Sequence, residues 1–206
     1  MKLIFITAIF CLWFSCLSTT SNGQPLTNEQ SNKKVKVSVY YETLCFGCRY
    51  EFLNVIVPTR KALWNYLDLE LIPFGNARIH PKQHSIQCQH GELECYGNQC
   101  QACAQDLFGF EKFYNYTRCM FESENYYSNP EYSSKQCAQQ LNLDYQQLNS
   151  CANGQKGLQL IREMANKTPS HQYVPWTTVQ GRFVDGNVDL VDYICQNYLN
   201  DVPACN

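Results

Sequence analysis

The sequence lacks an apolar run long enough to cross a bilayer, and it carries little charge. The apolar stretch LIFITAIFCLWFSCL at residues 3–17 is shorter than the roughly 20 residues that a transmembrane helix needs. Lys and Arg number 16 and Asp and Glu 18, which gives a formal net charge of −2 without a dense basic patch. We therefore expect no membrane span and no nucleic acid partner. The length of 206 residues and the hydrophobic content of 45% predict one domain, with room for an inserted subdomain.

The N-terminus is typical of a secretory signal peptide. Lys2 supplies a positive charge, the apolar stretch follows, and the polar text STTSNGQP ends it. We expect residues 1–22 to be the signal peptide and residues 23–34 to be a flexible lead-in. Loss of Cys11 and Cys16 with the signal leaves 11 of the 13 cysteines.

Eleven cysteines in a secreted chain of this size predict disulfide bonds, because the secretory pathway is oxidising. Two sequons, NYT at Asn115 and NKT at Asn166, fit the same route and predict N-glycosylation. We therefore expect the protein to enter the secretory pathway.

The hydrophobic pattern at the start of the mature chain predicts a βαβ unit. In VKVSVYY, which begins at residue 35, valines alternate with other residues, as in a strand. Residues 48–67 have helical spacing, with a kink expected at Pro58. Residues 67–75 alternate again, which indicates a second strand and completes the unit.

The middle of the chain has a different composition from its two ends. Residues 76–153 hold seven cysteines and little β-branched content, which predicts an all-helical insertion, and a further helix extends it to about residue 165. A strand-like residue pattern then returns in YVPWTTVQGRFVDG, with a turn expected at Gln180–Gly181. Near the end of the chain, the apolar spacing of residues 187–201 predicts an amphipathic helix.

Cys45 and Cys48 form a CxxC motif between the first strand and the helix. This context is that of a thioredoxin-like redox motif. We therefore expect an α/β fold over residues 35–206, a thioredoxin-like βαβ…ββα core with an inserted, disulfide-stapled helical subdomain at about 76–165. At the helix N-terminus, Cys45 is favoured as a thiolate and attacks a substrate disulfide, whereas Cys48, one turn on, resolves the intermediate.

Pro175, in HQYVPWTT, follows a loop and precedes a strand. A thioredoxin-like fold places a cis-proline at this point, opposite the dithiol. We expect Val174 and Pro175 to position the substrate through backbone pairing, which would tolerate many substrate sequences.

Metal binding is an alternative interpretation of the cysteines. A zinc site would combine Cys45 and Cys48 with Cys100 and Cys103, but 51 residues that include most of the βαβ unit separate the two pairs. A second candidate set consists of Cys88, His80, His84 and His90. In an oxidised insertion, surface histidines and a disulfide account for this set, and we expect no metal. A purely structural role for the CxxC pair is the remaining alternative.

The cysteines outside the dithiol number nine, which is odd. They are Cys88, Cys95, Cys100, Cys103, Cys119, Cys137, Cys151, Cys195 and Cys205. At least one is therefore free, joined to another chain or removed by trimming. Cys205, next to the C-terminus, is the first candidate, and a Cys195–Cys205 bond is the competing interpretation.

The segment CQHGELECYGNQCQAC at residues 88–103 resembles the signature of the gamma-interferon-inducible lysosomal thiol reductase family. That signature is CQHG, two residues, EC, two residues, N, four residues and C. The matching positions are Cys88, Gln89, His90, Gly91, Glu94, Cys95, Asn98 and Cys103. With the signal peptide, the CxxC motif and the VPW loop, the resemblance covers nearly the whole mature chain.

The resemblance implies a protein-disulfide reductase that works in an acidic endolysosomal compartment, with Cys45 as the attacking thiol and Cys48 as the resolving thiol. Its expected partners are disulfide-bonded, unfolded protein substrates and a small-thiol electron donor. No cofactor is expected, because cysteine sulfurs carry the electrons. Work at acid pH also predicts that the pKa of Cys45 lies well below that of an ordinary thiol.

Two alternatives use the same fold. One is a disulfide oxidase or isomerase of the secretory pathway, which differs from a reductase in the potential of the dithiol. The other is a secreted binding protein without turnover, which the presence of Cys48 disfavours.

Overall fold

A computed structural model describes residues 34–80 and 85–206. The expected signal peptide and all but the last residue of the lead-in lie outside these ranges.

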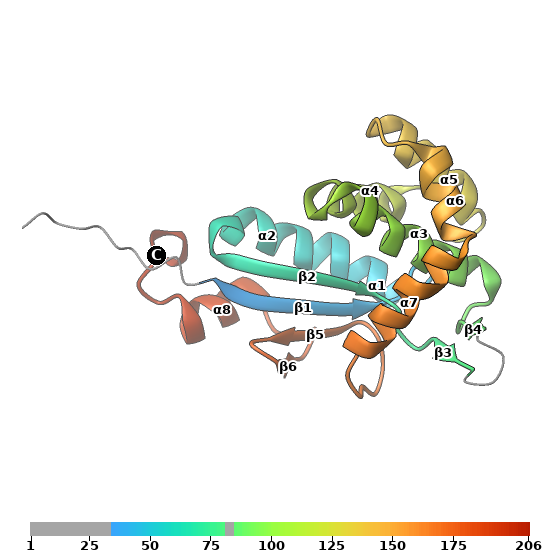
Figure 1. Ribbon diagram of the computed structural model, residues 1–206. Helices are drawn as coiled ribbons and strands as arrows, with labels where there is room; N and C mark the ends of the chain where they lie inside the picture. Colours follow the sequence, from blue (N-terminus) through green and yellow to red (C-terminus); the bar gives the residue numbers. More distant parts are fainter. Residues whose placement is uncertain (1–33, 81–84) are drawn as a thin grey trace, which may run out of the picture. The chain divides into compact units, whose positions relative to one another are not determined.

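A four-stranded sheet has the strand order β2-β1-β5-β6 (Figure 1). β1 (Val35–Tyr41) pairs parallel with β2 (Leu67–Pro73) and antiparallel with β5 (Trp176–Val179). β5 pairs antiparallel with β6 (Arg182–Val184). β1 thus has a neighbouring strand on each side, and its three valines are almost completely buried. This confirms the expected thioredoxin-like order of βαβ, helical insertion and ββα.

The helical segment between β1 and β2 changes its winding along its length. α1 (Phe46–Glu51) passes into the π turn η1 (Phe52–Ile56), α2 (Val57–Leu63) and the 3₁₀ turn η2 (Trp64–Tyr66). Pro58 lacks an N–H and cannot make the regular helical hydrogen bond. Immediately before Pro58, the N–H of Val57, at the start of α2, donates to the carbonyl of Phe52, five residues back. The interruption expected at Pro58 is therefore accompanied by a wide turn just upstream.

Helices dominate the insertion between β2 and β5. Those in the described residues are α3 (Glu92–Phe108), α4 (Phe110–Glu122), α5 (Pro130–Gln140), α6 (Tyr145–Ala152) and α7 (Gln155–Lys167). Figure 1 shows them gathered near the end of β1 that leads into α1. Gly109 separates α3 from α4 with a φ of 79°, a left-handed conformation that glycine adopts easily.

The expectation of an all-helical insertion is wrong for its first residues. β3 (Arg78–Ile79) and β4 (Ile86–Gln87) form a short antiparallel hairpin. Strands of two residues are too short to show an alternating pattern in the sequence, and only their pairing across the sheet identifies them.

Disulfide bonds staple the insertion and the C-terminus. Within the insertion they are Cys88–Cys95, Cys103–Cys151 and Cys119–Cys137. A fourth bond, Cys195–Cys205, joins α8 (Leu190–Tyr198) to the 3₁₀ turn η3 (Pro203–Cys205).

The prediction that Cys205 is the odd cysteine is therefore wrong, and Cys100 takes that place. After α8 the chain turns back, so that the Cα atoms of Cys195 and Cys205 lie 5.3 Å apart, within the span of a disulfide. Cys100 is fully buried on α3, and its sulfur lies 3.6 Å from the Ser134 hydroxyl that donates to it. Counting cysteines cannot identify which one lacks a partner, because tertiary packing decides this.

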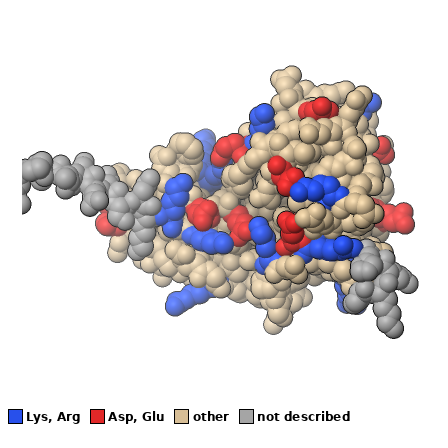
Figure 2. All heavy atoms as spheres, in the orientation of Figure 1, with Lys and Arg blue, Asp and Glu red and all other residues tan. Residues whose placement is uncertain are grey.

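The surface of the described chain carries charges of both signs. On the face drawn in Figure 2, Lys and Arg side chains lie between Asp and Glu side chains. No helix in the described ranges combines the length and the apolar character needed to cross a membrane.

Candidate active site

Cys45 occupies the N-cap position of α1, directly after the turn that follows β1. Its sulfur accepts a hydrogen bond of 3.1 Å from the backbone N–H of Cys48. The hydrogen bond from the Cys48 side chain is the largest influence on the pKa of Cys45 and lowers it, against the opposing effect of burial. The net pKa of Cys45 lies below that of an ordinary thiol, in the direction expected for an attacking thiolate.

Cys48 lies one turn deeper in the protein and is 1% exposed. Burial raises the pKa of Cys48 well above its ordinary value, and the adjacent Cys45 raises it further. The two thiols thus differ in acidity, whereas Cys45, at 8% exposed, is only slightly more accessible than Cys48. The thiolate form is therefore favoured at Cys45 and disfavoured at Cys48.

The Val174–Pro175 loop faces this pair. The peptide bond between the two residues is cis, and the Val174 carbonyl oxygen lies 3.8 Å from the Cys45 sulfur. Gly47 permits this approach, because a Cβ at that position would lie 3.2 Å from the Pro175 ring. The structure therefore brings together the CxxC motif and the proline loop, 129 residues apart in the chain.

Residues of the CQHG signature hold the turn that precedes Cys45. The Asn98 side-chain oxygen accepts a hydrogen bond of 2.9 Å from the buried backbone N–H of Thr43. The Thr43 hydroxyl donates to the Glu94 carbonyl at 3.1 Å. Gly97 lets α3 approach, since a Cβ there would lie 2.4 Å from the Thr43 hydroxyl oxygen. Part of the signature thus holds the backbone turn that leads into Cys45.

Replacing Asn98 by Ala is expected to destabilise the fold by about 1–3 kcal/mol, because a buried backbone N–H loses its acceptor. Urea unfolding measures the change in free energy. Asn54→Ala, at an exposed site on the helix, provides a matched control with a much smaller expected effect. Equal losses in the two variants would contradict this role of Asn98.

A group of three titratable side chains adjoins the same turn: Glu42, His90 and Glu94. The His90 Nδ1 atom lies 2.5 Å from a Glu94 carboxylate oxygen and 3.6 Å from one of Glu42. Burial raises the pKa of Glu42 to about 7, and the charge of Glu94 adds to this. Partial burial lowers the pKa of His90, but the hydrogen bond and charge of Glu94 outweigh it and raise the pKa overall.

This Glu42–His90–Glu94 group has donor atoms within 4.8 Å of one another, close enough to share a metal ion. In this structure the His90 Nδ1 atom and a Glu94 carboxylate oxygen form a direct hydrogen bond. The other metal sets considered from the sequence are not assembled in the described residues. Cys88 and Cys103 are bonded to other cysteines, and His80 contacts Gln87 of the hairpin, while His84 lies outside the described ranges.

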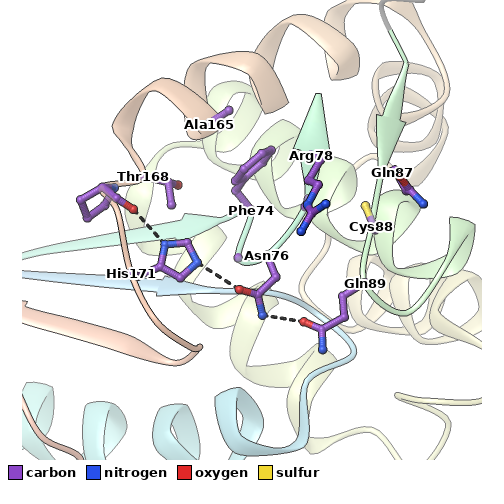
Figure 3. Close-up of a pocket in the computed structure, with 12 residues that line it drawn as sticks. Phe74, Asn76, Arg78, Gln87, Cys88, Gln89, Ala165, Thr168 and His171 are labelled. Carbon is purple, nitrogen blue, oxygen red and sulfur yellow. Dashed lines mark hydrogen bonds between the residues drawn. The ribbon is translucent and has the colours of Figure 1, made fainter. Parts of the chain in front are cut away.

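A second feature is a cavity of about 590 Å³, and Figure 3 shows the residues that line it. Its walls include Phe74, Asn76, Arg78, Cys88, Gln89, Thr168 and His171. Figure 3 shows a chain of hydrogen bonds across it, from His171 to Asn76 at 3.1 Å and from Asn76 to Gln89 at 2.5 Å. The backbone N–H of Asn76 also donates to the Glu42 carboxylate at 2.8 Å. This hydrogen bond links the cavity wall to Glu42.

Aromatic side chains surround the dithiol. Phe46, 71% exposed within the CxxC motif, stacks on Tyr127 with ring centres 4.5 Å apart. Next to the proline loop, Trp176 stacks on Phe183 at 3.9 Å. The neighbouring Tyr126 hydroxyl donates to the Cys45 carbonyl at 2.7 Å.

Sequence reasoning did not identify Glu42 or Tyr126 as site residues. A carboxylate at the end of a buried strand, three positions before the first cysteine, was a usable signal for Glu42. Tyr126 carried none, because it is one of 14 tyrosines and only the fold brings it to the motif. The two sequon asparagines, Asn115 on α4 and Asn166 on α7, are exposed and accessible for modification.

Comparison with known proteins shows which family this chain resembles. The model of the family "Gamma interferon inducible lysosomal thiol reductase (GILT)" matches residues 36–141. The gamma-interferon-inducible lysosomal thiol reductase of Mus musculus is 33% identical, over 80% of this chain and 68% of that protein. The gamma-interferon-responsive lysosomal thiol protein of Arabidopsis thaliana is 35% identical, over 91% and 80% respectively.

Similar solved structures have a thioredoxin-like fold. Reduced DsbA from Mycobacterium tuberculosis aligns with a TM-score of 0.62 at 19% identity, covering 90% of this chain and 93% of that chain. A thioredoxin-like oxidoreductase from Silicibacter pomeroyi DSS-3 aligns with a TM-score of 0.55 at 14% identity, covering 77% and 81% respectively. At these identities the likeness supports the fold alone.

Proposed function

The chain belongs to the gamma interferon inducible lysosomal thiol reductase family of thiol oxidoreductases, and on this basis we propose that it reduces protein disulfides through Cys45 and Cys48. The observation that carries the proposal is the asymmetry of the two sulfurs. Cys45, with a lowered pKa, sits at the helix N-terminus, and Cys48 is buried behind it with a raised pKa.

The exchange proceeds in two steps. The Cys45 thiolate attacks one sulfur of the substrate disulfide, and the other substrate sulfur leaves as a thiolate and takes a proton from solvent. Cys48 then loses its proton and attacks the Cys45 sulfur, which releases the second substrate thiol. Two electrons pass to the substrate, and the enzyme is left with a Cys45–Cys48 disulfide, which a small-thiol donor reduces while its own thiols are oxidised.

We place this reaction at acid pH in the endolysosomal pathway. A thiol with an ordinary pKa of about 8.5 would be only about one part in 3,000 ionised near pH 5. The lowered pKa of Cys45 increases that fraction. The predicted signal peptide and the exposed sequon residues Asn115 and Asn166 fit entry into the secretory pathway and glycosylation there.

The proposed substrates are unfolded chains. The Val174 carbonyl next to the Cys45 sulfur is placed to pair with the backbone of an extended segment. The exposed rings of Phe46, within the motif, and Phe183, which stacks on Trp176 next to the proline loop, offer apolar contacts that a folded, polar surface would not fill.

The test is reduction of a denatured, disulfide-bonded protein by the purified mature chain under a small-thiol donor, at about pH 5 and about pH 7. We expect activity at the acid pH, and we expect Cys45→Ser to remove it because the other free thiols among the described residues, Cys48 and Cys100, have raised pKa values. Activity confined to neutral pH would favour the oxidase or isomerase alternative. Absence of activity at both pH values would contradict the reductase proposal and favour a binding protein.

A further inference from the structure

Glu42 occupies an unusual position for a carboxylate. It is 1% exposed, and its backbone carbonyl accepts a hydrogen bond of 3.4 Å from the N–H of Cys45 itself. One carboxylate oxygen accepts from the Asn76 N–H, and the other lies 3.6 Å from His90. Within the described ranges His90 is the basic group that pairs with it, and no lysine or arginine does so.

The environment of Glu42 is tightly packed. A Cβ at Gly75, which has a φ of 58°, would lie 2.4 Å from its carboxylate oxygen. Glu94, which is fully buried, holds His90 at two points: one oxygen accepts from the His90 backbone N–H at 3.1 Å, and the other contacts the ring. The imidazole is thus fixed between two carboxylates while its side chain stays 40% exposed to solvent and its protons.

We propose that the Glu42–His90–Glu94 group favours the Cys45 thiolate when the surroundings become acidic. The proposal rests on the proposed function, because it assigns a positioning role to these residues in the same reaction. The catalytic thiol remains Cys45, and the group acts on it through charge.

Acidification changes two charges of the group. Glu42, whose pKa is about 7, loses its negative charge, and His90, whose pKa is raised, becomes positive. The Glu42 charge raises the pKa of Cys45 and the His90 charge lowers it, so both changes favour the thiolate. The free energy needed to ionise the Cys45 thiol therefore falls as the pH falls.

Other groups that face Cys45 do not reverse this effect. They are Cys48 from α1, Tyr126 and Tyr127 from the segment after α4, and Arg49, which lies over the Tyr126 ring. Raised pKa values keep Cys48 and both tyrosines neutral in this range, and a guanidinium keeps its charge throughout. Glu42 and His90 are thus the described neighbours whose charges change between acid and neutral pH.

The test is the rate of iodoacetamide alkylation of Cys45, measured from about pH 4.5 to about pH 9 in the wild type, Glu42→Gln and His90→Gln. Mass spectrometry identifies the modified cysteine. Glu42→Gln keeps the shape and the acceptor for Asn76 but imitates the protonated state. We expect it to raise the rate at neutral pH by about 3- to 10-fold, as for a shift of half to one pKa unit, and to leave the rate at about pH 5 unchanged.

His90→Gln removes the cation, so the expected effect has the opposite sign and the opposite pH range. The rate falls by about 3- to 10-fold at about pH 5 and stays near that of the wild type in alkaline solution. Glu51→Gln, a buried carboxylate on α1 bound to Thr177, and His80→Gln, an exposed histidine, are the matched controls. Circular dichroism verifies folding, and the solvent-accessible His90 site provides the test if Glu42→Gln does not fold.

Profiles of both variants within about twofold of the wild type at every pH would overturn the inference, as would a shift in the same direction in both. Alkylation requires no substrate disulfide, so it tests the charge group even if the reductase assay fails. Conversely, acid reductase activity together with unchanged alkylation profiles would overturn this inference and leave the proposed function intact.

Discussion

A Cys48→Ser variant is expected to lose about 100-fold or more of its turnover and to accumulate as a disulfide-linked complex with its substrate. Cys45 keeps its place at the helix N-terminus and still attacks. Resolution of the mixed disulfide must then wait for an external thiol, whereas the Cys48 sulfur is held next to Cys45 at a far higher effective concentration.

Non-reducing electrophoresis and mass spectrometry measure the trapped complex directly. Cys100→Ser is the matched control, because it makes the same chemical change at a buried free cysteine on α3 whose sulfur accepts a hydrogen bond from Ser134 of α5. We expect that variant to turn over normally. A Cys48→Ser enzyme with wild-type turnover and no trapped complex would contradict the assignment of Cys48 as the resolving thiol.

The second large effect concerns the stability of the insertion. Replacing both Cys103 and Cys151 by Ala is expected to lower the free energy of unfolding by about 4 kcal/mol, because the bond closes a loop of 48 residues. The same change at Cys195 and Cys205, where the separation is 10, is expected to cost about 2.7 kcal/mol. Changing both partners together avoids a new unpaired thiol.

Urea unfolding under non-reducing conditions compares the two double variants. Both losses follow from the entropy that each bond removes from the unfolded chain, so the order of the two values is the sharper prediction. If the C-terminal pair proved the more costly to remove, the loop-closure explanation would not hold for this protein.

The sequence was sufficient for the parts of the fold that rest on local patterns. The alternating valines of β1, the CxxC motif at the start of a helix and the turn at Gln180–Gly181 all have short-range signals, and the structure contains each of them. Gln180 and Gly181 have positive φ values of 50° and 76°, as a two-residue hairpin turn requires.

Features that depend on tertiary packing were not predictable. Glu42 and His90 are 48 positions apart, and they meet only because the CQHG loop packs on the turn after β1. The choice of Cys100 as the unpaired cysteine likewise depends on which side of α3 faces α5. The signature indicated a family, but its hydrogen bonds to Thr43 became apparent only in three dimensions.

The burial of the structural disulfides has a consequence for an enzyme of this kind. In the Cys103–Cys151 bond both cysteines are no more than 9% exposed, whereas each of the other three bonds has one half-buried cysteine, namely Cys95, Cys119 or Cys205. A thiolate must reach a sulfur to exchange with it. The bond that closes the longest loop is therefore the one that a thiolate of another copy reaches least easily.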